Sequence, residues 1–140
     1  MRALIDTNIA LTYVSGREDR YAGESVEIMR MCAEERIEGL IAFHSLSTIW
    51  YVLRQLPDRV RRDWIRQLCL ILKVSGADNN AVLAAIDNLE FRDFEDALQD
   101  CCAACDEADY IVTANLRDYE GHSRVKAVTP DVFITIVSQA

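Results

Sequence analysis

Short apolar runs alternate along the chain with longer segments whose apolar residues have helical spacing. Four runs, residues 2–6, 40–43, 109–115 and 125–130, are short and apolar enough to form buried strands. Residues 72–76 add a fifth run that predicts an edge strand. Because helical segments separate these runs, the pattern predicts a parallel sheet with helices packed against both faces.

The intervening segments place apolar residues three and four positions apart, which aligns them on one face of a helix. A turn or two of helix is predicted after residue 6, and longer helices are predicted over residues 24–39, 45–56, 58–72, 77–90, 93–108 and 131–139. In the first long helix Val26, Met29, Cys32 and Ala33 have this spacing, and Gly39 is the expected stop. We therefore expect a single domain over residues 1–140. Its predicted fold is an α/β three-layer sandwich with a central parallel sheet of four to five strands.

The composition is that of an ordinary globular domain. The 140 residues are 51% hydrophobic and 27% charged, and a chain of this length can bury a substantial core. No apolar stretch approaches the roughly 20 residues of a membrane helix, and the acidic N-terminal segment is unlike a signal peptide. We expect a cytoplasmic protein with no membrane partner. The five cysteines lie in apolar patterns, so we expect buried core residues rather than metal ligands.

The net charge of −8 is unevenly distributed along the chain. Residues 78–120 hold twelve acids against Arg92 and Arg117, whereas residues 54–66 hold five arginines against Asp58 and Asp63. An acidic half disfavours simple electrostatic adhesion to nucleic acid, because it repels phosphates. It favours the binding of divalent cations, since hard metals prefer carboxylate oxygens.

Polar side chains follow two of the predicted buried strands. Asp6 comes directly after the first strand, and Asn115 and Asp118 follow the run at residues 109–115. The carboxyl ends of parallel strands meet at the edge where open α/β sheets bind ligands, so we expect these side chains at one rim.

The segment DFEDALQ begins a helix with three acids. Asp93 is a favoured N-cap type, and acids in a first turn complement the helix dipole, so a structural role accounts for part of this cluster. Asp118 has a comparable interpretation as a solvated loop acid. Asp6 differs, because a carboxylate buried at the end of a strand is costly unless a cation or hydrogen-bond donors face it.

Four segments in order, LIDTNIALTYV, SLSTIWYVLR, DFEDALQ and DYIVTANLRDY, resemble the PIN domain family. The closest resemblance is to small single-domain bacterial PIN proteins of the VapC toxin ribonuclease type, and it covers residues 3–133. It implies a metal-dependent endoribonuclease that hydrolyses RNA phosphodiester bonds with Mg²⁺ or Mn²⁺, as the toxin of a toxin–antitoxin pair. It also implies an antitoxin partner and a homodimer, and apolar residues at Trp50, Tyr51 and Trp64 fit such contacts.

The resemblance further implies which residues form the site. Asp6, Asp96 and Asp118 would be the catalytic carboxylates, and they would hold the metal together with Asn115. The supporting residues around them would be Asn8, Thr48, Glu95 and Thr113.

Thr48 stands where this family usually has a glutamate in the helix after the second strand. With Asn115 at the fourth ligand position, two of four expected charges are absent, so a degenerate PIN domain that binds RNA or protein without cleavage is an alternative. A receiver-type phosphotransfer module would account for Asp6, Thr113 and Lys126. It would also need a second acid on the first strand, which the segment ALIDTN lacks.

Five arginines lie in the segment at residues 54–66, and a basic patch of this kind can bind an RNA backbone or an acidic partner. We predict that Arg61, Arg62 and Arg66 grip the phosphate backbone, and the alternative is a solvated helix face. His44 and His122 are far apart and lack the spacing of metal ligands, so we expect both to be structural or exposed.

Overall fold

Five parallel strands form the central sheet, in agreement with the expected four to five. The computed structural model describes residues 1–140, and its strands are β1 (Arg2–Ile5), β2 (Glu38–Ala42), β3 (Lys73–Ser75), β4 (Tyr110–Val112) and β5 (Lys126–Val128). They lie in the order β3-β2-β1-β4-β5, with every neighbouring pair parallel. The chain builds outward from β1 and then returns to its other side, which places the topological switch point between β1 and β4.

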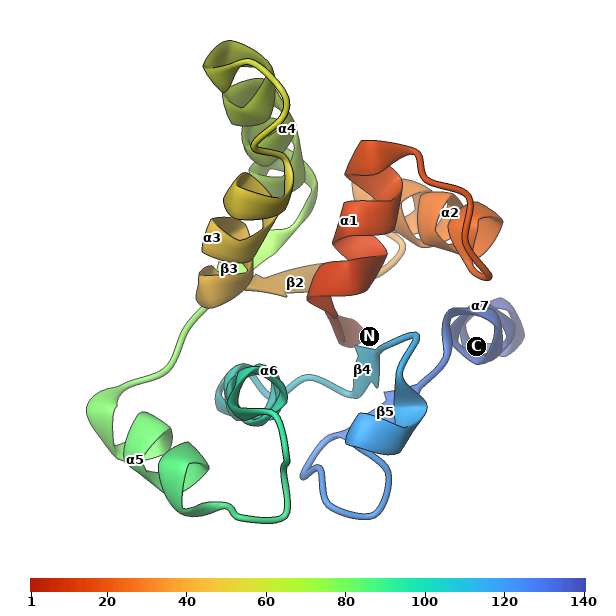
Figure 1. Cartoon of the computed structure of the whole chain (residues 1–140). Helices are drawn as coiled ribbons and strands as arrows, with labels where there is room; N and C mark the ends of the chain where they lie inside the picture. The colour runs from red at the N-terminus through yellow and green to blue at the C-terminus, as the bar shows by residue number, and fades with distance from the viewer.

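Seven helices surround this sheet (Figure 1). They are α1 (Thr7–Ser15), α2 (Ala22–Ala33), α3 (Phe43–Val52), α4 (Asp58–Ile71), α5 (Asn79–Asp87), α6 (Phe94–Cys105) and α7 (Pro130–Gln139), with a short 3₁₀ helix at Leu116–Asp118. No helix combines the length and the apolar character that crossing a lipid bilayer requires.

Alternate residues of β1 face opposite helical layers. Ala3 and Ile5 belong to a core of 19 buried residues that includes side chains of α1, α2, α3, α4 and α7. Leu4 belongs to a second core of 12 buried residues with side chains of α5 and α6. The fold is therefore the predicted three-layer sandwich, and burial of β1 on both faces explains its apolar run.

Helix α2 ends at Ala33, so the expected stop at Gly39 was wrong. Glu35 adopts a left-handed backbone conformation with φ of 58°, and the Arg36 amide donates to the Met31 carbonyl at 3.0 Å. This arrangement terminates a helix by satisfying its last carbonyls. The chain is then free to enter β2, where Gly39 lies.

The buried face of α2 agrees only in part with the predicted spacing. Met29 and Cys32 are buried as expected, but Val26 and Ala33 are exposed. Their places in the core are taken by Ser25, Ile28 and Met31.

The cysteines also divide into two groups. Three are buried, but Cys69 and Cys105 are exposed, so the expectation of buried cysteines was wrong for these two. Cys69 lies on α4, which buries only Leu68, and Cys105 is the last residue of α6. All five are free thiols.

Gly39 is required by close packing between β2 and its neighbours. A Cβ atom at this position would lie 2.5 Å from Leu72 Cδ2 and 2.6 Å from Cys32 Sγ. Both neighbours are buried and have little room to move.

We expect Gly39→Ala to lower the free energy of unfolding by about 1–3 kcal/mol, because it overpacks this contact. Urea denaturation followed by circular dichroism measures the change. The matched control is Gly23→Ala in α2, where a Cβ meets no atom within 4 Å, and which should stabilise the helix by about 0.5–1 kcal/mol. An unchanged unfolding midpoint for Gly39→Ala would show that Leu72 and Cys32 can move aside.

Candidate active site

Asp6 lies at the switch point, where the ends of β1 and β4 meet. Its backbone amide donates to the Val112 carbonyl at 3.0 Å, which continues the pairing of the two strands. Its side chain is the N-cap of α1, with Oδ1 accepting from the Thr7 amide at 2.8 Å. The other oxygen, Oδ2, accepts from the Thr113 hydroxyl at 2.8 Å. The carboxylate is only 5% exposed, and these two donors hold it in one orientation.

Asp96 reaches the same edge from the first turn of α6. Asp93 caps this helix by accepting from the Glu95 amide at 2.9 Å, which confirms its predicted role as N-cap. The hydroxyl of Tyr119, a fully buried residue, donates to Asp96 Oδ1 at 3.1 Å. Tyr119 thereby ties the orientation of Asp96 to the segment that carries Asp118.

A cavity of about 130 Å³ brings the predicted residues together, and we call it the acid cavity. Its lining consists of Asp6, Thr7, Asn8, Thr48, Asp93, Glu95, Asp96, Asn115 and Asp118. All the predicted metal ligands therefore lie around one space, and Thr113 holds Asp6 from behind. The convergence that the motif order predicted is present.

A buried hydrogen-bond network fixes Glu95 beside Asp6. Gln99 Nε2 donates to the hydroxyls of Thr7 at 2.8 Å and Ser45 at 2.9 Å. These hydroxyls are 2.7 Å apart, and Thr7 Oγ1 donates to Glu95 Oε1 at 3.2 Å. Since Thr7 has one proton, Ser45 must donate to Thr7 for all four contacts to hold. The network links α1, α3 and α6, and it was not predicted from the sequence.

Thr48 lies in the wall of the acid cavity but contributes no charge. Its hydroxyl approaches the His44 carbonyl of its own helix at 3.5 Å. Glu95 lines the same cavity from α6. A carboxylate is therefore present in the space beside Thr48, although it comes from a different helix than the family pattern implies.

The acids of this cavity lack a cationic partner. None of Asp6, Glu95, Asp96 or Asp118 forms an ion pair. Burial raises the pKa of Asp6 to about 6, although hydrogen bonds from Thr113 and Thr7 oppose the shift. Burial also raises the pKa of Asp96 to about 7, and the charges of Asp6 and Asp93 add to this effect.

This chemistry fits a hard divalent cation. Oxygen donors with excess negative charge are the ligands that Mg²⁺ and Mn²⁺ prefer, and a bound cation would relieve their mutual repulsion. No three acidic, histidine or cysteine side chains converge closely enough to form a ready-made metal cluster. The donor set is therefore suitable in type and charge for such an ion.

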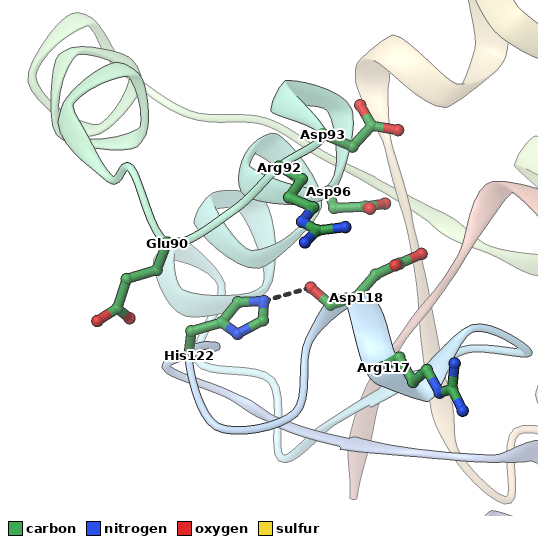
Figure 2. A pocket seen from close by; sticks show the side chains of 7 residues that line it. All are labelled: Glu90, Arg92, Asp93, Asp96, Arg117, Asp118 and His122. Atoms are coloured by element: carbon green, nitrogen blue, oxygen red, sulfur yellow. Dashed lines mark hydrogen bonds between the residues drawn. The ribbon is translucent and has the colours of Figure 1, made fainter.

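A larger cavity of about 590 Å³ adjoins the acid cavity, and we call it the arginine cavity (Figure 2). Its lining is wholly polar and consists of Glu90, Arg92, Asp93, Asp96, Arg117, Asp118 and His122. His122 Nε2 donates to the Asp118 carbonyl at 2.5 Å. The half-buried His122 is thus a structural residue, as expected, and it fixes the segment that carries Asp118.

The arginines predicted to bind RNA lie elsewhere, on α4. The guanidinium of Arg61 lies 3.8 Å from the ring centroid of Trp50, and that of Arg62 lies 5.3 Å from it. Ion pairs join Arg62 to Asp58 and Arg66 to Asp63. None of these arginines lines the acid cavity or the arginine cavity.

Comparison with known families identifies one match that covers most of the chain. The family model described as PIN domain matches residues 2–117. Comparison with curated protein sequences gives no match.

Several solved structures share the fold. VapBC2 from Rickettsia felis, determined bound to a DNA fragment from its promoter, has a TM-score of 0.71 at 13% identity and covers 92% of this chain and 98% of that chain. VapC20 from Mycobacterium tuberculosis, described as a Sarcin-Ricin loop cleaving toxin, has a TM-score of 0.60 at 17% identity, with 85% and 90% covered. VapBC-1 from nontypeable Haemophilus influenzae has a TM-score of 0.67 at 14% identity, with 94% and 99% covered.

The raised pKa of Asp96 predicts a specific pH dependence of stability. Because the folded-state pKa of about 7 exceeds the ordinary value of 3.8, the protonated form favours folding below about pH 4, and this contribution is lost as the pH rises through 7. With a chelator present, Asp96→Asn should be more stable than the wild type at pH 8. The expected gain is about 1 kcal/mol after allowance for partial exposure.

Thermal unfolding between pH 4 and pH 8 measures this difference, which should shrink steadily as the pH is lowered. The control, Asp63→Asn, removes an exposed carboxylate on α4 and should show no such trend. If Asp96→Asn is less stable than the wild type at every pH, the hydrogen bond from Tyr119 outweighs the charge repulsion.

Proposed function

The chain belongs to the PIN domain family, and we propose that it is a metal-dependent endoribonuclease that acts as the toxin of a toxin–antitoxin pair. The observation that carries this proposal is the acid cavity, in which unpaired carboxylates gather at the switch point of the sheet. Proteins of this family are nucleases, and one of the structurally similar proteins is described as a Sarcin-Ricin loop cleaving toxin.

In this proposal Asp6, Asp96 and Asp118 hold Mg²⁺ or Mn²⁺ with the help of the Asn115 amide. The bound ion would activate a water for attack on the phosphodiester and neutralise the developing charge. The protein's own part is to orient the ligands. Thr113 holds one oxygen of Asp6, and the cap to α1 holds the other.

We further propose that Glu95 supplies the carboxylate that Thr48 lacks. Its Oε1 is held toward Thr7, which is the residue that follows Asp6. Glu95 also lines the acid cavity together with Thr48 and Asp96. The site would then retain four carboxylates, Asp6, Glu95, Asp96 and Asp118, with Asn8 at its rim as a further polar contact.

The absence of glutamate at position 48 favours a second candidate function, a PIN domain that binds RNA or protein without cleavage. The two functions differ in one measurable respect, because only the enzyme requires metal in the acid cavity. In both cases Arg61, Arg62 and Arg66 remain a predicted RNA contact on α4.

A protein partner is the other component of the proposal. Two structurally similar proteins are named as VapBC, and an antitoxin would be the corresponding partner here. Large apolar side chains on α3, α4 and the α5 region offer surface for such an antitoxin or for a second copy of the chain. The most exposed of them are Phe43, Tyr51, Leu70, Leu83 and Leu89.

We expect Glu95→Gln to weaken Mn²⁺ binding by about tenfold or more, equivalent to about 1.4 kcal/mol, because it removes one charged ligand. Calorimetric titration of Mn²⁺ measures the affinity. Cleavage of a labelled single-stranded RNA of mixed sequence should fall with it. Thr48→Glu in the Glu95→Gln protein should restore both, since it returns a carboxylate to the same cavity from α3.

The matched control is Glu34→Gln, which removes an exposed carboxylate at the end of α2 and should leave metal binding unchanged. If the Mn²⁺ affinity of Glu95→Gln is unaltered, Glu95 is not a metal ligand of this site. A wild-type protein that neither binds Mn²⁺ nor cleaves RNA would favour the binding function over the enzyme.

A further inference from the structure

We propose that RNA crosses the acid cavity, with the phosphate on one side of the cavity bound by Arg92 and the phosphate on the other side bound by Arg17. This inference rests on the proposed ribonuclease function and adds to it the path of the substrate. It is carried by three adjoining cavities, whose centre is acidic and whose two ends contain arginine.

The three cavities share walls and form one groove. The acid cavity shares Asp93, Asp96 and Asp118 with the arginine cavity. On its other side it shares Asn8 and Asn115 with a third cavity of about 280 Å³. The remaining lining of this third cavity is Ile9, Thr12, Arg17, Asp19, Arg20, Tyr21 and Ala114. The groove therefore runs over the carboxyl ends of β1 and β4.

Arg92 marks the first end of the groove. Residues 78–120 contain only two basic side chains, Arg92 and Arg117, and both line the arginine cavity. Although acids surround them, neither forms an ion pair or a side-chain hydrogen bond. Figure 2 shows Arg92 in the same cavity lining as Asp96 and Asp118. Unused guanidinium donors at this point match the oxygens of a phosphate.

Aromatic packing fixes the backbone next to Arg92. The preceding residue, Phe91, is buried and packs edge-on against Tyr119 and His122, with ring centroids 6.0 Å and 4.6 Å away. Tyr119 and His122 in turn hold Asp96 and the Asp118 carbonyl. The backbone that carries Arg92 is thus fixed relative to the acids, which lowers the entropic cost of binding a phosphate.

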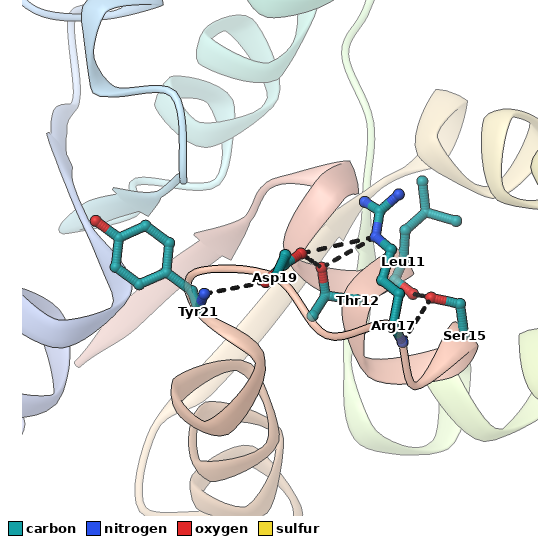
Figure 3. Close-up of polar contacts among 6 residues, drawn as sticks. All are labelled: Leu11, Thr12, Ser15, Arg17, Asp19 and Tyr21. Atoms are coloured by element: carbon teal, nitrogen blue, oxygen red, sulfur yellow. Dashed lines mark hydrogen bonds and ion pairs between the residues drawn. The ribbon is translucent and has the colours of Figure 1, made fainter.

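Arg17 marks the second end, in the loop between α1 and α2 (Figure 3). Asp19 organises this loop by accepting from the Thr12 hydroxyl at 2.5 Å and from the Tyr21 amide at 3.0 Å. Arg17 Nε lies 3.7 Å from Asp19 Oδ2 and donates to Thr12. Its two terminal nitrogens make no hydrogen bond, and Figure 3 shows them turned away from Asp19. They are free to bind an anion.

The charge pattern explains why substrate binding needs both ends. A phosphodiester at the centre of the groove meets several carboxylates, and the whole chain carries a net charge of −8. Arginines on both sides attract the adjacent phosphates and offset this repulsion. The acid cavity, with a volume of about 130 Å³, has room for a phosphate group.

The test measures RNA binding in a cleavage-impaired Asp96→Asn background, by fluorescence anisotropy of a single-stranded oligonucleotide at several salt concentrations. Arg92→Gln and Arg17→Gln should each weaken binding about tenfold. Each should lower the slope of log K against log salt by about 0.7, the value for one phosphate contact of a single strand. The double variant should lose about 1.4, and Arg92→Lys should retain the slope because it keeps the charge.

The matched control is Arg36→Gln, at the opposite edge of the sheet, which should leave the slope unchanged. A slope that does not change in Arg92→Gln or in Arg17→Gln overturns the two-sided path.

Cleavage by proteins with Asp96 intact separates this inference from the proposed function. If Arg92→Gln and Arg17→Gln cleave RNA at the wild-type rate, the proposed RNA path is wrong but the proposed ribonuclease function is not. If the salt slopes are as expected but the protein with Asp96 intact does not cleave RNA, the proposed RNA path is supported and the proposed ribonuclease function is wrong.

Discussion

The burial of one carboxylate at the junction of β1 and β4 constrains both the fold and the site. Asp6 continues the strand pairing through its amide, starts α1 through its side chain, and meets the end of β4 through Thr113. Two neutral donors are weak compensation for a buried charge, so the carboxylate is held in place but not neutralised. The neighbouring acids of α6 and of the 3₁₀ helix add to this charge. The same geometry that orders the sheet thus creates a position that attracts a cation.

The sequence predicted the parts of this molecule that depend on local pattern. The strands were visible as apolar runs because β1, β2 and β4 are buried on both faces, and Asp6 was visible because it interrupts such a run. The end of α2 was not visible, since a left-handed turn at Glu35 ended the helix before Gly39. The actual role of Gly39 depends on Leu72, which is far away in the sequence.

Some features of the site could likewise be predicted from the sequence, and others could not. The order of the motifs predicted that Asp6, Asp96, Asn115 and Asp118 would gather at one edge, and they line one cavity. The orientation of Glu95 was not predictable, because it depends on Thr7, Ser45 and Gln99 from three helices. The pairing of Arg92 with Arg17 could not be predicted from the sequence either, because only the folded chain places them at opposite ends of one groove.

The hydrogen-bond network behind Glu95 also has a consequence for proton movement. Its protons run in one direction, from the Gln99 amide through the hydroxyls of Ser45 and Thr7 to the carboxylate. An amide does not give up its proton at any physiological pH, so this chain ends at Gln99 and cannot act as a relay. The network therefore orients the Glu95 carboxylate, and no proton reaches that carboxylate along it from Gln99.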